Sequence, residues 1–366
     1  MKIRAIETIV LRIPYTTGGS KDTGAWGGRA WTTADALLVK VSTESGLVGW
    51  GEAFGYNAIP ATRAAIEQMI APICIGRSAL DIEPLLAELH AKLHIFGRGG
   101  PVIFGMSGLD IALWDIAGKA AGLPVAQLLG GRRAERLPAY ASLIRYAEPA
   151  LVAQNVERAM RDGFRHIKLH EVEVAPTRAA REAAGDSLPI MLDVNCPWTV
   201  QQALHMARQL EPLDLLWLEE PVWPPENIAG LAEVRAAGGI ALASGENFAT
   251  LTQYQQLLEA GAVDYVQPSP TKMGGISELV RVFTLARVHN ATVMPHSFYD
   301  GPGLLAAVHV NAALGRDSLV EWRYFDLEAR LYGGHMIPRE GSIEVPDGPG
   351  LGFDPDPEIV SRYRVD

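Results

Sequence analysis

The sequence predicts an α/β fold, namely a (β/α)₈-type barrel with an α+β N-terminal capping domain that the C-terminal tail completes. Eight short strand-like runs follow Pro138, and helical stretches separate most of them. Acidic residues end or closely follow three of these runs at nearly equal spacing. Residues 1 to about 125 show a different, mixed pattern. A doubly wound sheet is the alternative, but eight evenly spaced units favour closure into a barrel.

The first predicted domain, residues 1–125, combines strands and helices. Ile3–Ile13 is a β-rich run, and Ala34–Val41 and Leu47–Glu52 flank a turn signal, which predicts a hairpin. Thr16–Arg29 is rich in Gly and lacks an apolar period, so we expect a flexible connector or a lid. Periodic apolar faces predict helices at about 61–70, 83–95 and 105–121.

The second predicted domain, residues 126–324, holds the barrel. Its expected strands are 139–143, 166–170, 190–193, 215–219, 241–245, 264–267, 292–296 and 319–321. Two helices should begin at capping boxes, Thr199 with Gln202 and Thr250 with Gln253. The tail, residues 325–366, is rich in Gly and Pro and is expected to return to the first domain. In a barrel of this kind, chemistry belongs at the carboxyl ends of the strands.

Composition excludes several classes of partner. A net charge of −10 gives a nucleic-acid role no electrostatic support. Cys74 and Cys196 are the only cysteines, so there is no disulfide framework. The start lacks the apolar region of a signal peptide, and no apolar run is expected to span a membrane. We therefore expect a cytoplasmic protein without nucleic-acid or membrane partners.

Three carboxylates, Asp193, Glu219 and Glu246, end or closely follow neighbouring strand-like runs. Their spacings, 219 − 193 = 26 and 246 − 219 = 27, match the length of one strand-plus-helix unit. If the units repeat in register, the three side chains point to one place. Oxygen ligands without Cys or His suit Mg²⁺ better than zinc. Helix caps or surface acids are the alternative for each residue alone, and three in register favour the metal site.

The strand-end residues continue this register around the predicted barrel. They are Lys168-Leu169-His170, Asp193, Glu219, Glu246, Ser269, His296 and Glu321, and from Lys168 the successive steps are 25, 26, 27, 23, 27 and 25. Together with the segments 112–119 (ALWDIAGK), 128–131 (LLGG) and 272–275 (KMGG), this order resembles the enolase superfamily, in particular its mandelate racemase and muconate lactonizing branch. The resemblance covers nearly the whole chain. It implies Asp193, Glu219 and Glu246 as Mg²⁺ ligands, with Asn195 and Glu220 beside them.

The resemblance also implies a base that removes a proton next to a metal-bound carboxylate, a role that Lys or His fills in this class. Lys168 and His170 lie two apart on a strand and therefore share a face. The usual family pattern has Lys at both positions. Here His170, with Lys168, is the preferred base, since a nearby cation disfavours a protonated imidazole. His296 is expected to be the acid, although the two roles could be exchanged. A structural hydrogen-bonding role is the alternative for each histidine.

Two strand-end positions raise separate expectations. Ser269 stands where much of the branch carries an Asp, and where other members carry a Lys, so His296 would lack its usual carboxylate partner. Asp300 is a candidate replacement. Glu321 resembles the family's carboxyl group that donates a hydrogen bond to the substrate carboxylate, a role that requires a desolvated, protonated side chain. Lys272 resembles a lysine that supports a metal ligand rather than a base.

Segments 16–29 and 55–60 match the places where the family's first domain covers the barrel mouth. Trp26, Arg29 and Tyr56 are therefore candidates for contact with substrate. Arg29 could bind a distal carboxylate or hydroxyl group.

The leading functional hypothesis is a Mg²⁺-dependent acid-sugar dehydratase that forms a 2-keto-3-deoxy acid. A racemase or epimerase is the second hypothesis, and it needs competent bases on both faces of the substrate. A relative with a lapsed active site is the third, motivated by His170 and Ser269. The expected partner is a small-molecule carboxylate, a sugar acid, and the resemblance implies a homo-oligomer.

Overall fold

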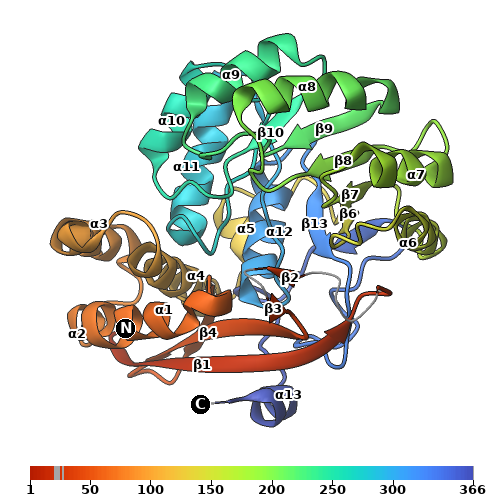
Figure 1. Cartoon of the computed structure of the whole chain (residues 1–366). Coiled ribbons are helices and arrows are strands. Elements are labelled where there is room, and N and C mark those ends of the chain that lie inside the picture. Colours follow the sequence, from red (N-terminus) through yellow and green to blue (C-terminus); the bar gives the residue numbers. More distant parts are fainter. Residues whose placement is uncertain (20–24, 27–28, 366) are drawn as a thin grey trace.

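The computed structural model describes residues 1–19, 25–26 and 29–365, and it describes side chains at all of these positions except 25, 26, 29 and 30. A barrel and an antiparallel capping sheet lie one above the other (Figure 1). The predicted fold class is therefore confirmed, and the doubly wound alternative is wrong.

The barrel contains eight parallel strands among the described residues. They are β6 (Arg136–Ser142), β7 (Ile167–Leu169), β8 (Ile190–Asp193), β9 (Leu215–Glu219), β10 (Leu242–Ser244), β11 (Tyr265–Val266), β12 (Thr292–Val293) and β13 (Val320–Arg323). They pair in the order β12-β11-β10-β9-β8-β7-β6-β13. The two outer strands meet where the Ser318 hydroxyl donates to the Val293 carbonyl at 2.6 Å and the Ser297 N–H donates to Glu321 at 3.0 Å. These contacts bring the ends of the curled sheet together.

Helices surround the barrel (Figure 1). They are α5 (Val125–Leu128), α6 (Pro149–Arg161), α7 (Val174–Ala184), α8 (Val200–Leu210), α9 (Ile228–Ala237), α10 (Leu251–Glu259), α11 (Gly275–Val288) and α12 (Pro302–Leu314), with a 3₁₀ turn at Glu211–Leu213. Both predicted capping boxes are present, at the starts of α8 and α10. Helix α12 is almost entirely buried because it contacts both the barrel strand β6 and the capping domain.

The capping domain is a sheet with helices against one face. Its elements are β1 (Ile3–Thr16), β2 (Ala25–Trp26), β3 (Arg29–Ala30), β4 (Thr33–Thr43), β5 (Val48–Ala53), α1 (Ile59–Ala65), α2 (Ala71–Cys74), α3 (Ile82–Leu93) and α4 (Pro101–Ala121), with 3₁₀ turns at Tyr56–Ala58 and His94–Phe96. A π-helical turn, Ile66–Ile70, joins α1 to α2. The predicted hairpin is β4 and β5. Helix α4 begins earlier than predicted, because Pro101 suits the first helical position.

The sequence was expected to hold no apolar run able to span a membrane. Helix α4 corrects this expectation, since by length and composition it could cross a membrane. However, 78% of its most apolar window is buried inside the protein. It packs so closely on β5 that a Cβ at Gly51 would overlap the Gly108 carbonyl oxygen. Its apolar character therefore reflects burial in the core of the capping domain.

The C-terminal tail returns to the capping domain. Its elements are β14 (Asp326–Leu327), β15 (Ser342–Glu344) and α13 (Pro357–Tyr363), of which β14 pairs with β1 and β15 with β6. Buried Asp115 of α4 accepts the backbone N–H groups of Leu351 at 2.8 Å and Trp50 at 2.9 Å. This carboxylate explains part of the 112–119 motif, because it ties α4 to both β5 and the tail. The exact domain boundaries stay a prediction.

Candidate active site

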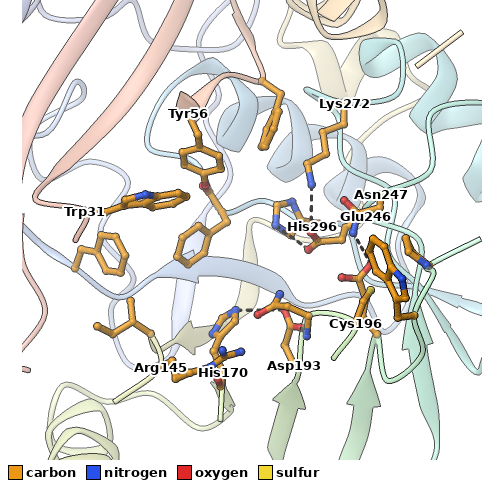
Figure 2. A pocket seen from close by; sticks show the side chains of 18 of the residues that line it. Trp31, Tyr56, Arg145, His170, Asp193, Cys196, Glu246, Asn247, Lys272 and His296 are labelled. Atoms are coloured by element: carbon orange, nitrogen blue, oxygen red, sulfur yellow. Dashed lines mark hydrogen bonds and ion pairs between the residues drawn. The ribbon is translucent and has the colours of Figure 1, made fainter. Parts of the chain in front are cut away.

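A cavity of about 830 Å³ opens at the carboxyl ends of the barrel strands and extends under the capping domain. Figure 2 shows side chains from both domains around it, with Trp31 and Tyr56 facing the polar groups of the barrel. Its lining includes the predicted site residues Tyr56, His170, Asp193, Asn195, Glu220, Glu246, Lys272 and His296. These predicted residues therefore lie together at the carboxyl ends of the barrel strands.

The three predicted metal ligands converge in the structure. One oxygen each from Asp193, Glu219 and Glu246 lies within 4.8 Å of the others, and all three residues are buried. Burial raises the pKa of Glu219 to about 8, with Lys168 lowering it and the neighbouring carboxylates raising it further. Close carboxylates that repel one another are stabilised by a cation. A donor set made only of oxygens fits a hard divalent ion such as Mg²⁺.

Lys168 occupies the floor of this cluster. Its ammonium group lies 2.7 Å from Glu321, 3.0 Å from Glu219 and 3.6 Å from Asp193. Burial would lower the pKa of Lys168, but Glu219 and Glu321 raise it well above its ordinary value. The described cavity lining does not include Lys168. The surrounding carboxylates favour the protonated form of Lys168, and its share in the role of base stays a prediction.

The surroundings of Glu321 favour its ionised form, whereas its expected role requires the protonated form. It is fully buried and accepts hydrogen bonds from the Ser142 hydroxyl at 2.9 Å and the Ser297 N–H at 3.0 Å. Burial would raise its pKa, but Lys168 and, to a smaller extent, His296 lower it to about 2. Without substrate, Glu321 thus pairs with Lys168 at 2.7 Å, and its role as a donor to the substrate carboxylate stays a prediction. It also lies outside the described cavity lining.

His170 lies at the cavity, just after β7. Its Nδ1 contacts the carbonyl oxygen of Leu143, and its Nε2 lies 3.2 Å from Asp193 (Figure 2). A carbonyl oxygen only accepts hydrogen bonds, so Nδ1 carries a hydrogen. Nε2 is consequently the nitrogen that faces Asp193 and the cavity. The ring also packs beside Phe298, with 6.1 Å between centroids.

His296 has different surroundings. Its Nε2 lies 3.1 Å from Glu246, and its Nδ1 lies 3.3 Å from both the Ser269 and Tyr299 hydroxyl oxygens. Burial lowers the pKa of His296, although Glu246 raises it in part. The suggestion that Asp300 replaces the missing carboxylate is wrong, because Asp300 pairs with Arg323 and Arg330 instead.

The remaining predicted barrel residues support the carboxylates. The Asn195 N–H donates to Asp193 at 2.9 Å, and Lys272 lies 3.2 Å from Glu246. Burial, together with the charges of Glu246 and Asp193, raises the pKa of Glu220 well above its ordinary value. Glu220 accepts a hydrogen bond from Asn247 at 2.8 Å.

Among the predicted capping residues, Tyr56 lines the cavity and packs against Trp31 with 4.8 Å between ring centroids. The side chains of Trp26 and Arg29 lie outside the described residues, so their predicted contacts stay untested.

The sequence analysis missed several residues of the cavity wall, namely Tyr15, Trp31, Phe54, Arg145, Asn247, Phe298 and Phe325. It also missed Tyr299, whose position three residues after His296 was the available signal. An aromatic residue in a loop carries no periodicity, so the sequence did not distinguish it from ordinary core.

Two family models match the chain. Residues 28–130 match the mandelate racemase / muconate lactonizing enzyme N-terminal domain, and residues 151–359 match the enolase C-terminal domain-like family.

Individual relatives and a solved structure cover almost the whole chain. The D-galactarolactone cycloisomerase of Agrobacterium fabrum is 33% identical, covering 100% of this chain and 99% of that protein. The arabinonate dehydratase of Saccharolobus solfataricus is 31% identical over 94% of each chain. The crystal structure of a racemase from Streptomyces coelicolor A3(2) with bound magnesium is 28% identical, covering 99% of this chain and 100% of that one, with a TM-score of 0.87.

Proposed function

The chain belongs to the mandelate racemase and muconate lactonizing branch of the enolase superfamily, and from this premise we propose that it is a Mg²⁺-dependent acid-sugar dehydratase. The observation that carries the proposal is the convergence of three buried carboxylates with two histidines at one cavity. The substrate would be a sugar acid, converted to a 2-keto-3-deoxy acid. A relative named arabinonate dehydratase supports this substrate class.

Asp193, Glu219 and Glu246 would hold the metal ion, because they are the residues whose oxygens converge. When bound, Mg²⁺ supplies positive charge that stabilises the negative charge developing on the substrate carboxylate. Lys168 supplies one positive charge beside these carboxylates, 3.0 Å from Glu219 and 3.6 Å from Asp193.

His170 is the proposed base. The Leu143 carbonyl fixes the hydrogen on Nδ1, so Nε2 would accept the proton from the carbon next to the carboxylate once Asp193, 3.2 Å away, is engaged by the metal ion. His170 also lines the cavity, which gives it access to substrate.

His296 is the proposed acid. Its Nε2 points into the cavity toward Glu246, an oxygen that can only accept while ionised (Figure 2). A hydrogen on Nε2 can therefore pass to the β-hydroxyl group as the carbon–oxygen bond breaks. Water leaves, and the resulting enol becomes the 2-keto acid.

A second candidate is a cycloisomerase acting on a cyclic sugar acid, and the 33% identical relative with that name favours it. His170 would again remove the proton from the carbon next to the carboxylate. The departing oxygen would belong to the ring, so it would stay attached to the product and no water would be lost.

The testing experiment is a screen of a stereochemically complete acid-sugar library, including lactones and anhydro sugars, with Mg²⁺ in D₂O. Mass spectrometry of each product would distinguish the reactions. Loss of one water with keto-acid formation would support dehydration, and an isomer of unchanged composition would support cycloisomerisation. Deuterium in recovered, inverted substrate would indicate epimerisation. No turnover and no exchange with any compound would favour a lapsed site. Homo-oligomerisation and a cytoplasmic location stay predictions.

A further inference from the structure

The segment between β6 and α6, residues 143–148, forms part of the cavity wall. Four of its residues line the cavity, namely Ile144, Arg145, Tyr146 and Ala147. Ala147 has a φ of 62°, in the left-handed region that residues with a side chain rarely adopt. A backbone conformation of this kind persists only where the surrounding structure holds it, and such residues cluster at functional sites. The segment therefore needs a contact that fixes it.

Glu171 supplies this contact. It directly follows His170 in the sequence and is buried, with 1% of its surface exposed. One of its carboxylate oxygens accepts the Tyr146 N–H at 2.7 Å, and the other accepts the Ala147 N–H at 3.0 Å. A single buried side chain thus holds two consecutive peptide groups where the backbone turns. Glu171 has no part in the proposed reaction itself, so the reaction does not account for this arrangement.

The segment in turn holds His170 at two points. The Leu143 carbonyl contacts Nδ1 of the ring, and the Arg145 Nε–H donates to the backbone carbonyl of His170 at 2.6 Å. Figure 2 shows Arg145 beside His170 at the cavity. Leu143 is itself fixed, because its N–H donates to the Lys168 carbonyl at 2.9 Å. The place of the His170 ring therefore depends on the shape of the segment that Glu171 fixes.

The same segment also meets the capping domain. Tyr146 is buried, and its hydroxyl donates to the Thr17 carbonyl at 2.6 Å. A change in the shape of the segment would therefore also disturb this contact between the barrel and the capping domain.

We propose that Glu171 is a positioning residue, which holds residues 143–147 in shape and so places His170 at the cavity. Glu171 lies outside the described cavity lining, so it acts through this segment rather than on the substrate. The inference rests on the proposed function in one respect only, namely that His170 is the base. The shape of the segment is a property of the protein without substrate or metal.

The direct test is amide hydrogen exchange without metal or substrate, read by mass spectrometry of peptides that cover residues 143–148. In Glu171→Ala, the amides of Tyr146 and Ala147 should exchange at least about 10-fold faster, because both lose their acceptor. Glu171→Gln should show a smaller effect, since a side-chain amide has one acceptor oxygen in place of two. Glu173→Ala is the matched control, because Glu173 is exposed in the same connection, and it should exchange like wild type. Unchanged exchange in Glu171→Ala would overturn the proposal.

A second substitution separates positioning from packing. Gly adopts a φ of 62° without the steric cost that Ala147 carries. In the double variant Glu171→Ala/Ala147→Gly, the segment should therefore regain part of its shape, whereas a packing defect left by the missing carboxylate would persist. Glu171→Gln keeps the volume of the side chain and replaces Glu171→Ala in each comparison if the alanine variant does not fold.

Kinetics with any sugar acid found in the screen shows whether the segment places His170. A small displacement of a reacting group can cost about 100-fold in rate, so kcat of Glu171→Ala should fall by about 10- to 100-fold. The double variant with Ala147→Gly should recover part of this loss, and Glu173→Ala should retain wild-type kcat. Faster amide exchange with unchanged kcat would overturn the positioning of His170.

Failure of the proposed function would be recognised separately. If no sugar acid is turned over, the proposed function fails, whereas the crystal structure of Glu171→Ala still shows where the His170 ring lies. A ring displaced from the Leu143 carbonyl would support the proposal, and a ring that keeps this contact would overturn it.

Discussion

Replacement of Lys168 by Met tests whether one ammonium group stabilises the buried carboxylates around it. Lys168 is 1% exposed and lies within 3.6 Å of Asp193, Glu219 and Glu321. Met keeps most of the apolar length of the side chain and removes the charge. The carboxylates would then be buried without their principal cation, which we expect to destabilise the metal-free protein.

The magnitude follows from Glu321. Its pKa is about 2 in the folded protein and ordinarily 4.5, so folding favours the ionised form. This stabilisation is fully present above pH 4.5 and is lost as the pH falls through 2. The shift of 2.5 units, of which Lys168 is the main favourable cause, corresponds to about 3 kcal/mol. Breaking a buried ion pair by removing one partner typically costs 3–5 kcal/mol. We therefore expect Lys168→Met to lower the free energy of unfolding by about 3–5 kcal/mol at pH 7.5.

The assay is urea unfolding at pH 7.5 in EDTA and again in excess Mg²⁺, followed by circular dichroism. If Mg²⁺ binds the three carboxylates, it supplies positive charge where the ammonium group was lost. The difference in unfolding free energy between wild type and variant should then become smaller. Lys92→Met is the control, because Lys92 is exposed and its loss should leave the unfolding midpoint unchanged. If Lys168→Met lowers the free energy of unfolding in EDTA by less than about 1 kcal/mol, the stabilising role of the ammonium group is refuted.

Three further predictions follow from individual side chains. His170→Asn should lower α-proton exchange with an accepted substrate by about 10²- to 10⁴-fold, as measured by deuterium incorporation. Glu246→Gln should weaken the thermal stabilisation by Mg²⁺, which for wild type amounts to about 2.7 kcal/mol at 100 times the Kd. Burial lowers the pKa of His309 to about 4, so its stabilising effect is present above pH 6.5 and is lost as the pH falls through 4. Between pH 7 and 5, protonation of this histidine should lower the free energy of unfolding of the wild type by about 2 kcal/mol. His309→Gln should not show this loss.

Each of these predictions has a control or a contrary result. His205→Asn, on the exposed face of α8, should retain full exchange, and retained exchange in His170→Asn would remove it as the base. Glu226→Gln is the control for Glu246→Gln, because it changes another carboxylate of the cavity wall. It should keep the full thermal stabilisation by Mg²⁺. Equal acid sensitivity of wild type and His309→Gln would contradict the assigned cause.

Most of the fold could be predicted from the sequence because the patterns that indicate strands and helix starts are local and repeated. Strand-like runs at regular intervals predicted all eight barrel strands, and the Thr–Gln pairs predicted two helix starts. The same regularity predicted the convergence of Asp193, Glu219 and Glu246, since residues at the ends of adjacent parallel strands are neighbours in space. The full length of α4 was missed because the helix begins at Pro101, before the predicted start near residue 105.

Tertiary structure decided the protonation states and the hydrogen-bond partners. Glu321 and Lys168 are 153 positions apart (321 − 168), yet their contact at 2.7 Å favours the anionic form of one and the cationic form of the other. Tyr299 and Ser269 meet at His296 through loops whose conformation no periodic pattern encodes. The sequence by itself therefore determined that these carboxylates and the two histidines lie at the same end of the barrel. Their charges and hydrogen positions depend on through-space distances and burial, which only the folded chain sets.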